Sequence, residues 1–137
     1  MIHEEICTDE VCKLAKEKGF PQHPDENGKC RIYTLDKSKN TYVLCDWTVW
    51  ISASWTSEVI AAPTQSLLQR WLREEKGLYI SVEAYPILAI IKKVCFAWVI
   101  KSESDGHFMK SNDSHQTFYS YELALEDALK YALEKLV

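Results

Sequence analysis

Glycine and closely paired cysteine are what this chain has least of. It carries 4 glycines among 137 residues, and they stand singly at positions 19, 28, 77 and 106. Neither a P-loop nor a G-x-G-x-x-G run is present, which excludes nucleotide binding through those loops. The motifs G-x-S-x-G, S-x-x-K and H-E-x-x-H are also missing. The sequence therefore predicts no cofactor, no catalytic residue and no enzymatic activity.

The cysteines do not form the close pairs that mark a structural zinc site. There are 5, at irregular spacing, and no C-x-x-C occurs. Cys7 and Cys12 are five positions apart, so they would not share a helix face well. Cys45 and Cys95 fall in apolar strand patterns, where a thiol stays protonated and inert. We expect buried, reduced cysteines and no metal site.

A concentrated basic face is missing too. The formal net charge is −4, and residues 31–119 carry ten basic and nine acidic side chains between two acidic ends. Gripping nucleic acid through many phosphates requires clustered Lys and Arg, so a nucleic-acid partner is disfavoured. No apolar run approaches the roughly 20 residues of a membrane helix, and the first residues, MIHEEICTDE, do not resemble a signal peptide. We expect a soluble cytoplasmic protein without a membrane partner.

Three helices are marked by their caps. Thr8 and Gly19 bound a helix over about 9–18, and Thr64 and Gly77 bound a second helix that follows Pro63. A third begins after Ser120 and runs to the end of the chain, with its inner stripe at Leu125, Ala128, Leu129, Ala132, Leu133 and Leu136.

The second helix, APTQSLLQRWLREEKG, combines tryptophan with basic side chains, which raises the question of a recognition surface. Its large apolar groups share one stripe, and burying each is worth about 2 kcal/mol. The stripe is Leu67, Leu68, Trp71 and Leu72. The side chains that face elsewhere are Gln65, Gln69, Arg70, Arg73 and Lys76. The helix is therefore predicted to be a wall of the core.

Strands are indicated by alternation and turns. RIYTLD (31–36) and a run from Thr41 form a hairpin, and apolar odd positions from Val43 to Trp55 predict a long strand with those side chains buried. Residues 79–86 predict a half-buried strand that ends at Pro86. Residues 94–100, VCFAWVI, predict a central strand covered on both faces, and 107–110 an edge strand.

The predicted fold is α+β, in one domain over residues 1–137. Strands joined mainly by hairpins favour a mainly antiparallel sheet of about five strands with three helices packed on it. The predicted order is α-β-β(-β)-α-β-β-β-α.

Exposed aromatic side chains are the best candidates for a contact site. Trp50 falls on the polar face of the long strand, near Tyr42. Because interfaces are enriched in Trp, Tyr and Arg, we take Trp50, Tyr42, Arg70 and Arg73 as possible protein-contact residues. The alternative for Trp50 is that another element covers it.

Three blocks carry a resemblance to a known family: TDEVCKLAKEKGF (8–20), APTQSLLQRWLREEKGLYISVEAY (62–85) and FYSYELALEDALKYALEKL (118–136). The chain resembles a family of short uncharacterised single-domain proteins of Bacteroides-type bacteria, often borne on prophages or mobile elements. Leu123 stands where that family has an acidic residue. The resemblance implies a single-domain α+β fold and a mobile-element origin, and no particular activity.

The sequence thus favours a small non-enzymatic accessory or protein-interaction module. Its partner would be another protein or a second copy of the chain. The alternative is a nucleic-acid-associated regulator, and the only residues that support it are the basic side chains Arg70, Arg73 and Lys93. A small enzyme would require a pocket with converging polar groups.

Overall fold

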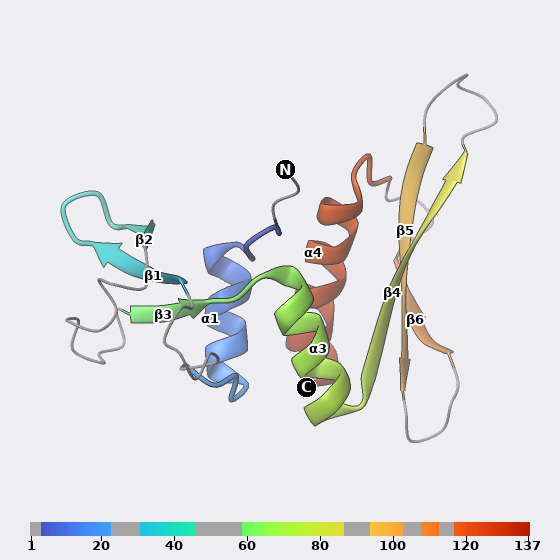
Figure 1. The fold of residues 1–137 in the computed structure, drawn as a ribbon, viewed down its shortest axis with the longest axis horizontal. Helices are drawn as coiled ribbons and strands as arrows, with labels where there is room; N and C mark the ends of the chain where they lie inside the picture. Colours follow the sequence, from blue (N-terminus) through green and yellow to red (C-terminus); the bar gives the residue numbers. More distant parts are fainter. Residues whose placement is uncertain (1–3, 23–30, 46–58, 87–93, 103–107, 113–116) are drawn as a thin grey trace. The chain divides into compact units, whose positions relative to one another are not determined.

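The computed structural model describes residues 4–22, 31–45, 59–86, 94–102, 108–112 and 117–137 (Figure 1). The chain forms two compact units, residues 1–64 and 65–137. The expectation of one domain stays a prediction.

The first unit begins with helix α1, Asp9–Glu17. Its N-cap is Thr8, whose side chain accepts a hydrogen bond from the Val11 amide at 3.3 Å, as the sequence predicts. The chain leaves the helix through Gly19 at φ 96°, a conformation that glycine adopts without strain. Val11, Cys12 and Ala15 are each 1% exposed, so one side of the helix is buried.

Three antiparallel strands complete this unit: β1 (Arg31–Asp36), β2 (Thr41–Cys45) and β3 (Val59–Ala62), in the order β2-β1-β3. The predicted hairpin between β1 and β2 is confirmed. Asn40 takes the positive φ of 52° that closes the turn, and Asp36 Oδ1 accepts from the Ser38 amide at 3.0 Å and the Ser38 hydroxyl at 2.6 Å.

Strand β3 is at the edge of this sheet, and other parts of the first unit cover that edge. Side chains and the segment before α1 bond to alternate backbone groups along it: Lys16 Nζ donates to Val59 O at 2.9 Å, Ala61 N donates to Gln22 Oε1 at 2.9 Å, and Cys7 N donates to Pro63 O at 3.0 Å. An edge with its groups satisfied in this way does not recruit a further strand.

The second unit begins with helix α3, Gln65–Lys76, which ends at Gly77 with φ 66°. Leu68 and Leu72 are fully buried, which confirms that the helix is a wall of the core. Trp71 is half-buried, and the Lys76 ammonium lies 5.4 Å from its ring centroid.

The two glutamines of α3 contradict the prediction that they face away from the core. Gln65 is 5% exposed and donates to Glu122 O at 2.9 Å and to Glu126 Oε2 at 2.8 Å. Gln69 Nε2 donates to Ile80 O at 2.7 Å. Both amides satisfy polar groups at the border of the core, where an unpaired one would be costly.

The second sheet holds β4 (Leu78–Pro86), β5 (Val94–Ser102) and β6 (Phe108–Ser111), antiparallel and with β5 central, as predicted. Helix α4 (Tyr121–Tyr131) follows its N-cap Ser120, which accepts from the Leu123 amide at 3.0 Å, and continues into the π-helix η1 (Ala132–Leu136). Helices α3 and α4 lie on one side of this sheet (Figure 1). The side chains buried between these layers include Leu68, Leu72, Leu78, Ile80, Trp98, Ile100, Leu125, Ala128, Leu129 and Leu133.

The α+β class, the antiparallel strands and the three predicted helices are thus confirmed. The prediction of one sheet of about five strands is not matched, because the described strands form two three-stranded sheets. Strand β1 pairs with β2 and β3, and β4 pairs with β5, whereas β3 leads through Pro63 into α3 rather than pairing with β4. Alternation indicates how a strand is buried, but not which strands share a sheet.

The predicted burial of the long strand is wrong at Val43, which is 45% exposed, while Tyr42 and Leu44 are half-buried. The register pairs Leu35 with Tyr42, and the Lys13 ammonium of α1 lies 4.3 Å from the Tyr42 ring centroid. The even-numbered face of β2 is therefore the one that meets α1. Residues 46–55 of the predicted strand lie outside the described residues.

Candidate functional site

A cavity of about 300 Å³ lies between β5, β6 and α4 in the second unit. Trp98 is 2% exposed, and its indole N–H donates to Asp127 Oδ2 at 2.8 Å. The Tyr131 ring lies 5.4 Å from the Trp98 ring, centroid to centroid, and the Lys110 ammonium lies 5.7 Å from the Tyr131 centroid. The residues lining the cavity are Trp98, Lys110, Ser111, Asp127, Lys130, Tyr131 and Glu134.

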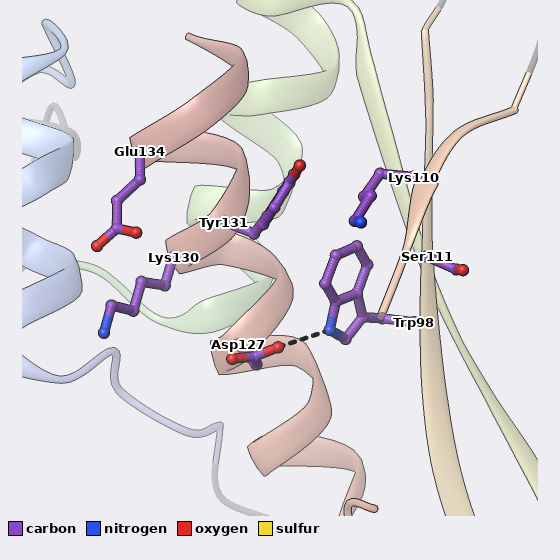
Figure 2. Close-up of a pocket in the computed structure, with 7 residues that line it drawn as sticks. All are labelled: Trp98, Lys110, Ser111, Asp127, Lys130, Tyr131 and Glu134. Atoms are coloured by element: carbon purple, nitrogen blue, oxygen red, sulfur yellow. Dashed lines mark hydrogen bonds between the residues drawn. The ribbon is translucent and has the colours of Figure 1, made fainter. Parts of the chain in front are cut away.

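The polar groups of this cavity do not converge on one point (Figure 2). The Lys130 and Glu134 side chains extend away from Trp98, and Ser111 points to the other side of the sheet (Figure 2). Asp127 is already engaged with the indole N–H. Binding a small molecule requires polar groups placed around a common volume, so these residues fit a stabilising role better than a ligand site.

The opposite face of the same sheet carries exposed side chains, and we call it the open face. Its members are Tyr79, Ser81, Glu83 and Tyr85 on β4, and Ala97, Val99 and Lys101 on β5. Tyr79 is 42% and Tyr85 39% exposed, whereas Cys95, at one end of this face, is fully buried. Side chains alternate between the faces of a sheet, and Ile80 and Trp98 point to the helices, so these neighbours point away from them.

The open face combines exposed tyrosines with half-buried aliphatic side chains. Val99 and Ala97 are half-buried in the centre of the open face, between the exposed β4 side chains and β6. Interfaces are enriched in aromatic residues and poor in charge at their centre. The prediction that β5 is covered on both faces holds at Cys95, which is fully buried, and only in part at Ala97 and Val99, which are half-buried.

The outer edge of β4 has backbone groups that bond to nothing else in the described part of the chain. The Trp98 amide donates to Asn112 Oδ1 at 2.9 Å, and the Phe96 amide donates to Phe118 O at 2.8 Å, so both groups point away from β4. In two antiparallel strands, residues that lie opposite each other either exchange two backbone hydrogen bonds or exchange none.

Val82 faces Trp98 and Ala84 faces Phe96 across the β4–β5 pair. The amide N–H and carbonyl groups of Val82 and Ala84 therefore point outward, away from β5. Ile80 follows the same alternation, and its carbonyl accepts from Gln69 Nε2. Within the described residues the outward groups of Val82 and Ala84 have no partner, in contrast to the covered edge of β3.

A second group of exposed apolar side chains surrounds the start of α4. Tyr119 is 59%, Tyr121 42% and Leu123 61% exposed. The Tyr121 ring meets Phe96 edge to face, with centroids 6.3 Å apart. These residues continue the helix side of the sheet, and residues 113–116, which precede them, lie outside the described part of the chain, so the open face is the better defined of the two surfaces.

Of the predicted contact residues, those that the structure describes do not belong to the open face. Trp50 lies outside the described residues. Tyr42 belongs to the first unit, where Lys13 covers one face of its ring. Arg70 and Arg73 are exposed on α3, on the helix side of the second unit.

Arg70 is held by an ion pair one helical turn away. Its Nε donates to Glu74 Oε1 at 2.8 Å, and this hydrogen bond raises the pKa of Arg70. Both side chains are more than half exposed, so the pair contributes little to stability. With its charge offset locally, Arg70 adds little to a phosphate-binding surface.

Within the described ranges, no group of three or more His, Cys, Asp or Glu side chains is arranged to hold a metal ion. In the same ranges no helix combines the length and apolarity needed to cross a membrane.

Sequence reasoning missed the open face although a signal for it was present. The apolar pattern on both faces of 94–100 is typical of a strand covered on both sides. The described helices of the second unit, however, cover only one of them. The tyrosines at 79 and 85 share the parity of Ser81 and Glu83, and that pattern could have located an aromatic outer face.

No protein-family model, no curated protein and no solved structure matches this chain.

Proposed function

We propose that this protein is a non-enzymatic interaction module that docks another protein on the open face of its second sheet. The observation that carries the proposal is the exposure of Tyr79 and Tyr85 beside the half-buried Val99, on the face that α3 and α4 leave uncovered. Exposed tyrosines contribute large contact area at a small cost in conformational entropy. The mobile-element origin that the family resemblance implies stays a prediction.

The open face suits a protein better than a nucleic acid. Lys101 is its only cation, and Glu83 offsets that charge among the described residues of this face. Phosphate binding needs several cations without such compensation. We therefore expect a protein partner, and the experiment has to exclude a nucleic acid.

The experiment is affinity capture from a lysate of the native cells, with and without nuclease, followed by mass spectrometry. Val99→Lys places a charge at the centre of the open face, and a buried charge at an interface weakens binding steeply. Glu75→Gln changes the net charge by the same amount on the exposed surface of α3 and is the matched control.

We expect the unmodified protein and Glu75→Gln to retain the same stoichiometric protein, and Val99→Lys to lose it. Circular dichroism must show that Val99→Lys stays folded. A partner retained equally by all three would place docking elsewhere, with Trp50 the next residue to test. Recovery that disappears after nuclease treatment would instead support the nucleic-acid alternative.

A further inference from the structure

The pattern of side-chain types in β4 is symmetric about Val82, with a tyrosine three residues away on each side. Reading outward from that residue, Ser81 mirrors Glu83, Ile80 mirrors Ala84, and Tyr79 mirrors Tyr85. When two copies of a strand pair antiparallel about a two-fold axis at one residue, each residue faces its mirror position in the other copy. The sequence around Val82 can therefore be tested for self-complementarity residue by residue.

The backbone of β4 meets the first requirement of such pairing. The outward groups belong to the even-numbered residues Ile80, Val82 and Ala84. An axis at Val82 sets even residues opposite even residues, so outward groups of one copy meet outward groups of the other. Val82 bonds to Val82 of the second copy, and Ile80 to Ala84. The Ile80 carbonyl, which already accepts from Gln69, has a second lone pair for this bond.

The side chains of the open face meet the second requirement. With the axis at Val82, Tyr79 faces Tyr85 of the second copy, and Ser81 faces Glu83, so that the hydroxyl can donate to the carboxylate. These are the close, non-hydrogen-bonded pairs, in which aromatic pairs and hydrogen-bonding pairs stabilise a sheet.

An axis at Glu83 would set the two Glu83 carboxylates against each other, which is unfavourable. An axis at Ser81 would set Tyr79 against Glu83. Among the neighbouring registers, the one centred on Val82 pairs tyrosine with tyrosine and leaves no like charges opposed.

Among the described residues, no segment covers the middle of the β4 edge, where the pairing would occur. Proteins protect long edge strands with prolines, charges, bulges or covering segments. In β4, a strand of nine residues, Pro86 stands at the end and Gln69 takes one carbonyl. In the described part of the chain, the outward groups of Val82 and Ala84 have no such cover.

We propose that two copies of this chain associate through antiparallel pairing of their β4 strands, with a two-fold axis at Val82. The β4-β5-β6 sheet of one copy and that of the second copy then form one six-stranded sheet. The open faces of the two copies become continuous across the axis. This pairing goes beyond the proposed docking function and does not depend on it, because the edge of β4 and the centre of β5 are separate surfaces.

The first test is sedimentation equilibrium over a range of concentrations up to roughly 1 mM, where even weak association is detected. The unmodified protein should show a monomer–dimer equilibrium. Val82→Pro should be monomeric throughout with an unchanged far-ultraviolet spectrum, because it removes an N–H that points away from its own sheet. A protein that is monomeric over the whole range, or a dimer that persists in folded Val82→Pro, overturns the proposal.

A pair of substitutions at one exposed position tests the register without altering the backbone. Ser81→Lys sets a cation opposite Glu83 twice in each dimer, and Ser81→Glu sets a carboxylate there. Two such pairs should lower the dissociation constant about tenfold for lysine and raise it about tenfold for glutamate. Equal effects of the two charges, or none, would overturn the register.

Amide hydrogen exchange gives an independent readout by residue. In dilute monomer the Val82 and Ala84 amides should exchange fast, while the Ser81 and Glu83 amides, which bond to β5, are protected. Raising the concentration should protect the first pair selectively. Unchanged exchange at Val82 in a solution that contains dimer would place the interface elsewhere.

The two proposals fail separately. A Val99→Lys variant that still forms dimers while losing its partner supports docking and self-pairing together. If Val82→Pro no longer dimerises but still binds the partner protein, this result also supports both docking and self-pairing. Absence of any partner alongside a normal dimer overturns only the docking function.

Discussion

Replacing Asp127 with alanine should destabilise the second unit through a single hydrogen bond. The Trp98 indole is 2% exposed, and its N–H donates to Asp127 Oδ2 at 2.8 Å. This bond joins the central strand β5 to helix α4 across the core. In Asp127→Ala, the indole N–H remains where it is and loses its acceptor.

The expected magnitude follows from the surroundings of that bond. A hydrogen bond to a charged group contributes about 1.5–3 kcal/mol to stability. Asp127 and Trp98 border the cavity of about 300 Å³, so water can reach the N–H and recover part of that energy. We therefore expect a loss of about 1.5 kcal/mol for Asp127→Ala, which corresponds to a decrease in Tm of about 5 °C.

Asp127→Asn is the matched variant, because its side-chain carbonyl still accepts a hydrogen bond but carries no charge. It should lose about half as much as Asp127→Ala. Glu134→Ala removes another carboxylate that lines the cavity, one that points away from Trp98, and should change stability by less than about 0.5 kcal/mol.

Urea unfolding followed by circular dichroism measures these differences at constant m-value. The reasoning would be refuted if Asp127→Ala lost no more than Glu134→Ala. It would also be refuted if Asp127→Asn and Asp127→Ala were equally destabilised, since the retained acceptor would then have no effect.

Three further predictions concern a buried side chain in the second unit, and a helix cap and a turn in the first unit. Leu72→Ala should cost about 3 kcal/mol in urea unfolding, because Leu72 is fully buried and its removal leaves a cavity; a loss below about 1 kcal/mol would contradict its place in the core. Thr8→Ala should cost about 1 kcal/mol, since the Val11 amide loses its cap, whereas Thr8→Ser should retain it in the same measurement. The Ser38 hydroxyl and amide lower the pKa of Asp36 from 3.8, so Asp36 stabilises the turn above the unfolded pKa and this contribution is lost as the pH falls through the lowered value. Ser38→Ala should raise the pKa of Asp36 toward 3.8 in an NMR titration, and an unchanged value would show that the hydroxyl is not the cause.

Most of the local structure follows from the sequence because it depends on neighbouring residues. The caps at Thr8 and Ser120 bond to amides three positions away. The stops at Gly19 and Gly77 depend only on the φ of one residue. Such signals need no knowledge of the rest of the fold.

The open face, which is the proposed contact site, could not be predicted in the same way. Exposure of Tyr79 and Tyr85 depends on which face α3 and α4 cover, and the apolar pattern of β5 is compatible with either answer. The half-buried Tyr42 is a second example, because its ring meets Lys13, a residue 29 positions earlier in the chain. When residues far away in the chain bury a side chain, that burial produces no periodic pattern in the sequence around it.

The amino-acid sequence by itself determined the helices, the hairpin of β1 and β2 and the central position of β5, since periodicity, caps and turns act over a few residues. Tertiary structure alone decided that the strands divide into two sheets, that the β3 edge is covered by Lys16 and Gln22, and that the β4 edge keeps outward amides at Val82 and Ala84. Which backbone groups of an edge strand find partners depends on contacts between segments far apart in the chain, and no local pattern in the sequence encodes those contacts.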